Sequence, residues 1–334
     1  MPSTKHGEVA LIQRIRDRAA RMGTSLPLGI GDDCALLRFK AGEEAAVTTD
    51  LSVENRHFRL DLHPPEAIGH RTLARGLSDL ASMGARPVAA FLSLGLRSEL
   101  ISPAGRRGTA WVDRFLDGFF GLAEQNKVPL AGGDVAESSL VLADIVVIGA
   151  VPRGKGLLRS GANPGDSIYV TGRLGGSAAA LRRFSQGALR APNVDLAPHL
   201  WPQPRIQQGV WLRRHSAATA AIDISDGLST DLHHLCAESG VCAEIEARSL
   251  PIFQGATLSD ALNGGEDYEL LFTARQTARI PRRIAGVPVC RIGVIGKKAV
   301  KRARVTLVDT SGLRTLEPRG WEHFRTESSN HSSY

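Results

Sequence analysis

Apolar segments that lead into glycine and aspartate recur along this chain. The first is residues 28–37, where Asp32 and Asp33 stand on a glycine-flanked bend between apolar residues. Four later segments carry acids in the same kind of setting, and the acids of the five segments together are Asp32, Asp33, Asp50, Asp79, Asp134, Asp223 and Asp226. Clustered carboxylates repel one another unless cations lie between them, and Mg²⁺ prefers oxygen ligands from carboxylates, phosphates and water. The pattern therefore predicts a fold that directs these acids towards magnesium carrying a nucleotide.

Helical and extended patterns alternate through the chain, which predicts the α/β (α+β) fold class. Helices are expected over residues 8–22, 65–83, 111–124, 177–184, 205–214 and 228–239. Strands are expected over residues 45–50, 88–96, 128–131, 140–151, 165–172, 219–224, 242–245, 287–295 and 304–308, with Asp50 and Asp134 at or just beyond strand ends. Residues 185–204 are rich in proline and lack a clear period, which predicts a loop.

The length of the chain, 334 residues, is sufficient for two domains. Residues 152–156 (PRGKG) resemble an interdomain joint. We therefore expect an N-terminal domain over residues 1–152 and a C-terminal α/β domain over residues 153–325. Residues 326–334 are polar and are expected to be a frayed tail.

Composition favours a small anionic substrate over nucleic acid or a membrane. The net charge is +7, but the basic residues are dispersed among 34 acids and only 5% of residues are aromatic. No apolar run is long enough to span a bilayer, and the start of the chain leads into a helical pattern instead of a signal sequence. The four cysteines form no CxxC pair and are interpreted as reduced thiols. These features predict a soluble cytoplasmic protein with no nucleic-acid or membrane partner.

Several common catalytic motifs are missing from the sequence. Residues 172–177 (GRLGGS) lack the lysine of a GxxxxGK[ST] phosphate loop, and the kinase HRDxxxxN and DFG sets, GxSxG and HExxH are also absent. His233 and His234 lie near Cys236, but a zinc site needs more ligands in closing geometry, so we interpret them as structural. The absence of the phosphate-loop and kinase motifs excludes the common phosphotransferase folds.

Eight ordered motifs resemble those of the thiamine-monophosphate kinases, a family of the aminoimidazole-ribonucleotide synthetase-like superfamily. The motifs are residues 29–35 (GIGDDCA), 48–50 (TTD), 55–57 (NRH), 78–87 (SDLASMGARP), 132–134 (GGD), 159–166 (RSGANPGD), 223–227 (DISDG) and 264–270 (GGEDYEL). The resemblance covers nearly the whole chain. It implies a two-domain fold whose N-terminal mixed sheet pairs across a homodimer.

The resemblance also implies roles for individual residues. The implied magnesium ligands are Asp33, Thr48, Thr49, Asp50, Asp79, Asp134, Asp223 and Asp226, with Asp32 beside them. The implied ATP contacts are Gly133, Asp134, Arg159 and Ser225, and the implied thiamine-phosphate contacts are His57, Glu266 and Trp321. No side chain is expected to act as a nucleophile or an acid–base catalyst, because phosphoryl transfer depends mainly on positioning and charge neutralisation.

The activity implied by the resemblance is ATP- and Mg²⁺-dependent phosphorylation of thiamine monophosphate, by direct in-line transfer, to give thiamine diphosphate and ADP. Another ATP-using member of the superfamily, such as an aminoimidazole-ribonucleotide synthetase, is the alternative. A selenophosphate synthetase would have a reactive cysteine near the N-terminus, and a hydrogenase-maturation protein would end in a cysteine motif, whereas this chain ends in residues 328–334 (SSNHSSY). A non-catalytic nucleotide-binding regulator is the third hypothesis, although it would need fewer carboxylates.

Overall fold

The computed structural model describes residues 7–23, 26–102, 109–185, 196–298 and 304–324. The chain forms two compact units. The first comprises residues 1–80 and 85–156, and the second comprises residues 81–84 and 157–334. None of the helices in the described ranges combines the length and the apolar character that crossing a membrane requires.

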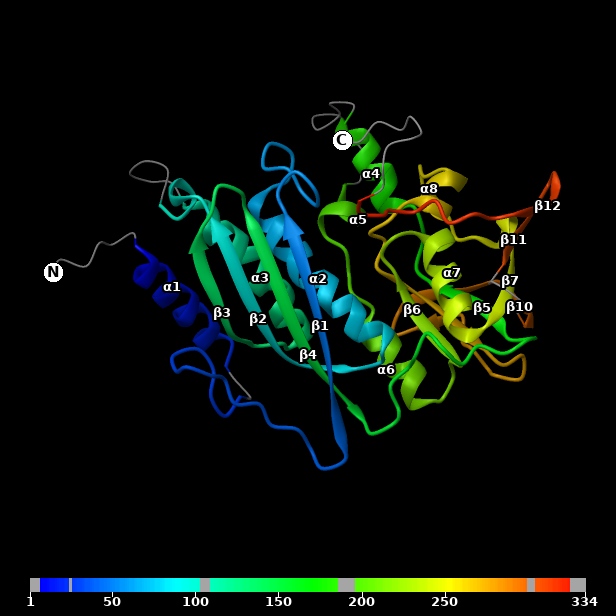
Figure 1. The fold of residues 1–334 in the computed structure, drawn as a ribbon, viewed down its shortest axis with the longest axis horizontal. Coiled ribbons are helices and arrows are strands. Elements are labelled where there is room, and N and C mark those ends of the chain that lie inside the picture. The colour runs from blue at the N-terminus through cyan, green and yellow to red at the C-terminus, as the bar shows by residue number, and fades with distance from the viewer. Residues whose placement is uncertain (1–6, 24–25, 103–108, 186–195, 299–303, 325–334) are drawn as a thin grey trace. The chain divides into compact units, whose positions relative to one another are not determined.

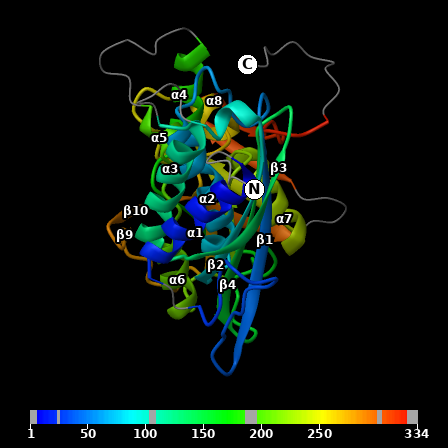
Figure 2. The same ribbon diagram turned by 90° about the vertical axis from the view of Figure 1, so that its left-hand side faces the viewer.

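The first unit is built on a four-stranded mixed sheet in the order β1-β4-β2-β3, in which only the β2–β3 pair is parallel. Its elements are α1 (Glu8–Arg21), β1 (Glu43–Val53), α2 (Pro65–Ser82), β2 (Arg86–Leu96), the 3-10 helix η1 (Ser98–Leu100), α3 (Trp111–Asn126), β3 (Leu130–Glu137) and β4 (Leu142–Pro152). Helices α2 and α3 lie on the same face of this sheet (Figures 1 and 2).

Small residues allow α2 to approach its neighbours closely. A Cβ atom on Gly76 would lie 2.5 Å from a methyl of Val147 in β4, and one on Gly69 would overlap the carbonyl oxygen of Phe115 in α3. The apolar face of α2 is buried in the space this leaves, with Leu73 and Leu77 fully inaccessible. Tight packing of this kind fixes the position of α2 relative to β1 and β4.

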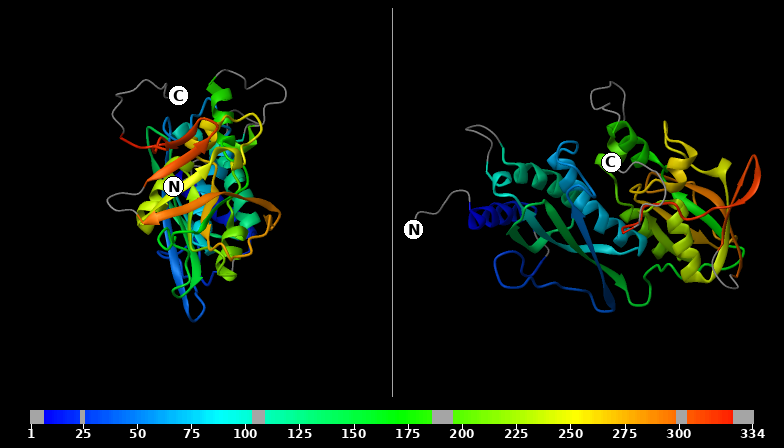
Figure 3. Two further views of the ribbon diagram at one scale, coloured as in Figure 1. Left: turned by 90° about the vertical axis from the view of Figure 1, so that its right-hand side faces the viewer. Right: turned by 45° about the horizontal axis from the view of Figure 1, so that its top comes forward.

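The second unit is built on an eight-stranded, mainly antiparallel sheet (Figure 3). The strand order is β12-β11-β7-β10-β5-β8-β6, with β9 paired to β10, and only β7 and β11 pair in parallel. Its first elements are β5 (Ser167–Thr171), α4 (Gly176–Ser185), α5 (Ala197–Leu200), α6 (Ile206–Arg214), β6 (Ala220–Ile224), α7 (Leu228–Ser239) and β7 (Val241–Glu246). The 3-10 helix η3 (Ala247–Ser249), α8 (Leu258–Asn263), β8 (Glu269–Ala274), β9 (Arg283–Ile284), β10 (Val287–Lys298), β11 (Val305–Asp309) and β12 (Gly312–Thr315) follow.

The core of the second unit joins α7 to the sheet. Leu228, Leu232 and Leu235 recur at helical spacing along α7, are fully buried, and belong to one apolar cluster with Ile222 of β6 and Leu271 of β8. Gly240, in the left-handed conformation at φ 64°, ends the helix. The start of α7 is thereby held beside the end of β6, where several candidate site residues lie.

The predicted helices and most predicted strands are confirmed, and three expectations were wrong. Asp50 and Asp134 are not at strand ends, because β1 continues to Val53 and β3 to Glu137, and their backbones pair with Ile145 and Ser93. Residues 197–200 of the predicted loop form α5, which has a proline in its first turn. Residues 186–195 of that loop and the predicted tail of residues 326–334 lie outside the described residues.

Candidate functional site

The acids of the opening motif stand on an exposed loop of the first unit. Leu36 donates its N–H to the Leu28 carbonyl at 3.0 Å, which closes the loop, and Gly31 adopts a φ of 132°. Asp32 Oδ1 accepts the Asp33 backbone N–H at 2.9 Å, so one oxygen of the Asp32 carboxylate is occupied by a hydrogen bond within the loop. In the described part of the chain the Asp33 carboxylate has no hydrogen-bond or ion-pair partner. This difference supports Asp33 as the better candidate for direct metal ligation.

Strand β1 and helix α2 bring three of the predicted ligands together. The Thr48 hydroxyl donates to Asp79 Oδ2, and Asp50 forms a 3.1 Å ion pair with Arg75. Asp79 lies in the last turn of α2, which contains no basic residue. A carboxylate is unfavourable at a helix C-terminus, so a cation bound here would stabilise the arrangement.

Thr49 faces the opposite side of the sheet from these residues. Side chains alternate along a strand, and the Thr49 hydroxyl lies 3.2 Å from the carboxylate of Asp144 on β4. The Thr49 side chain therefore does not join Thr48 and Asp79. Asp144 was not predicted as a site residue, because in the sequence it only interrupts an apolar strand.

Asp134 and Gly133 lie on β3, at the other edge of the sheet. Gly133 has a φ of 150°, and a Cβ at this position would overlap the carbonyl oxygen of Leu92 in β2. Asp134 accepts the Val135 N–H at 2.8 Å. Because β4 and β2 separate β1 from β3, three strand spacings of about 4.8 Å place these two strands roughly 14 Å apart.

The predicted metal ligands consequently do not form one preformed cage. Across the described ranges, no three histidine, cysteine, aspartate or glutamate side chains converge as a metal-binding group. In the first unit the candidate ligands fall instead into the exposed loop, the β1–α2 group and β3.

His57 lies in the turn that follows β1. The Val53 backbone N–H donates to the His57 ring nitrogen Nδ1 at 3.0 Å, and the His57 backbone N–H donates to the Val53 carbonyl at 2.9 Å. Because Nδ1 is an acceptor, this bond places the proton of the neutral ring on Nε2. His57 is half-buried.

In the second unit, Asp223, Ser225 and Asp226 lie at the end of β6. Asp223 is 3% exposed inside the strand, and Ser225 and Asp226 form the turn into α7. The Asp231 carboxylate accepts three backbone N–H groups of this turn, from Ser225 and Asp226 at 3.1 Å and from Gly227 at 3.0 Å. Burial, together with the charges of Asp223 and Asp226, raises the pKa of Asp231 well above its usual value.

Asp231 was missed by sequence reasoning. The available signal was an acid in the first turn of a helix that follows a Ser-Asp-Gly bend. In the structure this acid holds the turn that presents Asp226.

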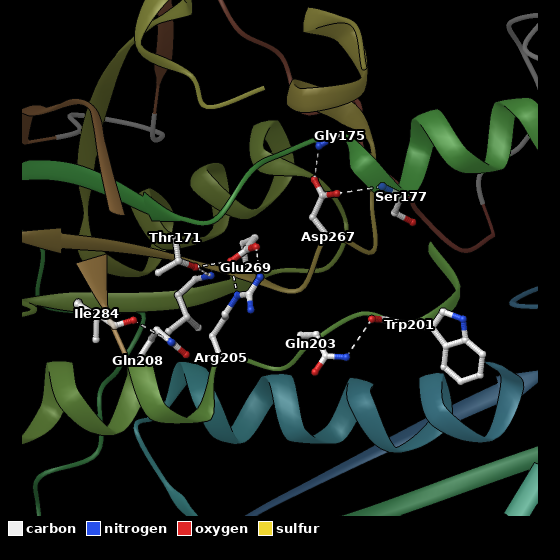
Figure 4. A network of polar contacts seen from close by, with 11 residues as sticks. Thr171, Gly175, Ser177, Trp201, Gln203, Arg205, Gln208, Asp267, Glu269 and Ile284 are labelled. Atoms are coloured by element: carbon white, nitrogen blue, oxygen red, sulfur yellow. Dashed lines mark hydrogen bonds and ion pairs between the residues drawn. The ribbon is translucent and has the colours of Figure 1, made fainter. Parts of the chain in front are cut away.

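The loop of residues 264–268 packs against the same turn. Glu266 donates its N–H to the Ser225 carbonyl at 2.8 Å, and Tyr268 donates to the Ile224 carbonyl at 2.9 Å. Both residues are in the left-handed region, at φ 66° and 49°. Asp267 accepts N–H groups of Gly175 at 2.6 Å and Ser177 at 3.3 Å, around the first turn of α4 (Figure 4). Desolvation raises the pKa of Asp267 to about 7.

Trp321 completes this group. Its backbone N–H donates to the Asp226 carbonyl at 2.9 Å, and the Gly320 backbone N–H donates to Thr230 Oγ1 at 3.0 Å. A Cβ on Gly320 would overlap the Asp226 carbonyl oxygen, so the chain can follow this path only with glycine there. The Trp321 side chain is 39% exposed. The structure thus gathers Asp226, Ser225, Glu266 and Trp321 at one place.

Arg159 lies away from this group. Its carbonyl accepts a hydrogen bond from Ser239 at the C-terminal end of α7, and the neighbouring Leu158 carbonyl pairs with Ala221 at the start of β6. Ser225 and Asp226 instead follow the C-terminal end of β6 and precede the N-terminal end of α7. The 12 residues of α7 separate the two positions by about 18 Å.

Comparison with known proteins places this arrangement in a family. Residues 31–151 match the model of the AIR synthase related protein N-terminal domain, and residues 163–306 match that of the C-terminal domain. A thiamine-monophosphate kinase of Salmonella typhimurium is 37% identical over 96% of this chain and 99% of its own length.

Solved structures agree with this assignment. The crystal structure of a thiamine-monophosphate kinase from Stenotrophomonas maltophilia is 39% identical, has a TM-score of 0.74, and covers 90% of this chain and 96% of its own. A structure described as AaThiL complexed with AMPPCP and TMP is 30% identical, has a TM-score of 0.72, and covers 97% of this chain and 99% of its own. The chain belongs to the AIR synthase related proteins and, within them, to the thiamine-monophosphate kinase family.

Proposed function

We propose that this protein transfers the terminal phosphoryl group of ATP to thiamine monophosphate, giving thiamine diphosphate and ADP. The observation that carries the proposal is the group at the end of β6, where backbone hydrogen bonds hold Glu266 against Ser225 and Trp321 against Asp226. A carboxylate and a half-exposed indole suit an aminopyrimidine and a cationic thiazolium. Relatives at 37% identity over nearly the whole chain are named for this activity.

Mg²⁺ fits the residues present. The donors are all oxygens, and Asp79 lacks a basic residue in its helix turn. The proposed ligands are Asp33, Thr48, Thr49, Asp50, Asp79, Asp134, Asp223 and Asp226, with Asp32 beside them. Bound Mg²⁺ ions would neutralise the charge of two polyanions brought together for transfer. Because Thr49 directs its side chain to the Asp144 face, its contribution would have to come from the backbone.

The chain's own residues bind and orient the substrates. Glu266 accepts a hydrogen bond from the amino group of the pyrimidine, Trp321 stacks on the substrate, and His57 donates through Nε2–H. The acceptor phosphate is already anionic at neutral pH, so no side chain has to remove a proton from it. Gly133, Asp134 and Ser225 contact ATP, and the exposed Arg159 supplies a cation to its phosphates.

We further propose that the protein is a cytoplasmic homodimer. Val47 and Leu51 are 62% and 50% exposed on the face of β1 opposite Thr48 and Asp50. Burial of this apolar surface favours pairing with a second copy. All four cysteines are free thiols, which supports a reducing compartment. In this proposal residues 1–152 bind metal and nucleotide and form the dimer, and residues 153–325 form the second domain.

The test is to incubate the protein with ATP, Mg²⁺ and thiamine monophosphate and to identify the products by mass. We expect thiamine diphosphate and ADP in equal amounts. Formation of ADP without thiamine diphosphate would contradict the kinase assignment and favour another ATP-using reaction of the family.

A further inference from the structure

A buried histidine approaches the proposed substrate carboxylate. His199 on α5 is 1% exposed, and its Nδ1 lies 2.9 Å from Ser177 Oγ and 3.6 Å from Glu266 Oε2. The edge of its ring packs on Phe184 with centroids 5.9 Å apart. One ring nitrogen of His199, Nδ1, therefore faces both the hydroxyl at the start of α4 and the carboxylate of Glu266.

The segment that carries His199 is anchored a second time at the start of β8, directly after the 264–268 loop. Arg205 Nε donates to Glu269 Oε2 at 2.6 Å, and Thr171 Oγ1 donates to the same oxygen at 2.6 Å (Figure 4). Between the two anchors, Gln203 donates to the Trp201 carbonyl at 3.2 Å. Residues 197–205 thus form a brace that approaches Glu266 of the loop through His199 and binds Glu269, the first residue of β8, through Arg205.

Glu266 needs such a brace. Its φ of 66° is a left-handed conformation, which is unfavourable for a non-glycine residue and persists only when its surroundings enforce it. A glutamate side chain also loses rotamer freedom when it is fixed, which opposes binding. A carboxylate held in position before the substrate arrives avoids that loss at the moment of binding.

We propose that His199 is a positioning residue that fixes the Glu266 carboxylate for recognition of the heterocyclic base of the substrate, with Ser177 orienting the imidazole. This inference rests on the proposed function, in which Glu266 contacts the aminopyrimidine of thiamine monophosphate. His199 itself does not touch the reacting phosphates. Its loss should therefore weaken binding of thiamine monophosphate and leave the affinity for ATP unchanged.

The test uses His199→Phe, which keeps a ring against Phe184 but removes both nitrogens. We expect the dissociation constant of thiamine monophosphate, measured by calorimetry, and its KM to rise about tenfold, and the KM of ATP to stay within about twofold. His199→Asn keeps an amide near the Nδ1 position and should restore part of the affinity. His215→Phe is the matched control, because His215 is exposed and its ring stacks on Trp211 at 4.3 Å. It should behave as the parent protein.

A double-mutant cycle separates positioning from general destabilisation. If His199 acts through Glu266, adding His199→Phe to Glu266→Gln should change the dissociation constant by less than about twofold. Additive losses, or a lower melting temperature with an unchanged dissociation constant, would overturn the proposal. Should His199→Phe not fold, Ser177→Ala must give a smaller loss in the same direction, and no loss would overturn it as well.

The same experiments distinguish failure of the proposed function. If the parent protein binds thiamine monophosphate without forming thiamine diphosphate, the kinase function fails while the cycle still reports on His199. If Glu266→Gln binds as tightly as the parent protein, the inference about His199 is overturned while the kinase function stands. Absence of any binding by the parent protein would overturn both.

Discussion

Asp231 holds Asp226 in place through the backbone, with Asp231 Oδ2 accepting the Asp226 N–H at 3.1 Å. The same oxygen accepts the N–H groups on either side, so one carboxylate organises the whole turn between β6 and α7. These bonds use the backbone of Asp226 and not its carboxylate. The turn that presents a proposed metal ligand therefore depends on an acid that is not itself proposed as a ligand.

Replacing Asp231 should separate the role of its shape from the role of its charge. Asp231→Ala leaves three N–H groups that are buried or partly buried without an acceptor, which we expect to cost about 3 kcal/mol of unfolding free energy and most of the turnover. Asp231→Asn keeps one acceptor oxygen and removes a charge that burial already disfavours, so its loss should be about 1 kcal/mol. Urea denaturation and product formation measure both effects. Equal losses for the two variants would contradict the role of the turn.

Asp79→Asn and Asp226→Asn should each abolish turnover while the fold stays intact. Each substitution removes a negative charge proposed to face Mg²⁺, whereas the amide keeps the volume of the side chain. Asp309→Asn is the control, because Asp309 pairs with Arg314 in the β11–β12 hairpin. Product formation and near-ultraviolet circular dichroism are the measurements. Near-normal activity in either site variant would refute that ligand assignment.

Gly133→Ala should destabilise the first unit and weaken nucleotide binding. Its Cβ would overlap the Leu92 carbonyl at a φ of 150°, and neither backbone can move without breaking the β2–β3 ladder. We expect a loss of about 3 kcal/mol. Gly121→Ala is the matched control, because it lies in α3 with no atom within 4 Å of the new Cβ, and it should stabilise by up to about 1 kcal/mol. Similar stabilities for the two variants would show that Gly133 is not sterically required.

Asp267 should make the protein less stable as the pH rises. Its pKa is raised to about 7 in the folded state, against 3.8 for an ordinary aspartate. Between these values the folded chain keeps a proton that the unfolded chain releases, so unfolding free energy falls with pH, by at most about 1.4 kcal/mol per pH unit. The contribution is fully present below about pH 4 and is lost above about pH 7. Urea denaturation from pH 4 to 8 should show a shallower slope in Asp267→Asn, and parallel slopes would contradict the raised pKa.

The local motifs were readable from the sequence because they combine residue type with short spacing. The glycine bend beside Asp33, the helix ending after Asp79 and the Asp223–Gly227 turn all lie where the pattern predicts. The extension of β1 and β3 past Asp50 and Asp134 was not predicted, because sheet pairing with β4 and β2 overrides polar composition.

Asp267 and His199, which support the candidate site, could not have been found from local sequence motifs. Asp267 is bonded to backbone groups 92 and 90 positions away, and His199 meets Ser177 and Glu266 only after α4, α5 and β8 have packed together. Such contacts have no local signature. The separation of Thr49 from Thr48 follows from strand alternation, but the partner of Thr49, Asp144, is set by the β1–β4 register.

In the proposed reaction a phosphoryl group passes directly from ATP to thiamine monophosphate. ATP labelled with ³²P at the γ position tests it when incubated with the protein, Mg²⁺ and thiamine monophosphate. We predict that the label appears in the terminal phosphate of thiamine diphosphate, in an amount equal to the ADP formed. Label recovered in inorganic phosphate, with thiamine monophosphate unchanged, would contradict direct transfer to thiamine monophosphate.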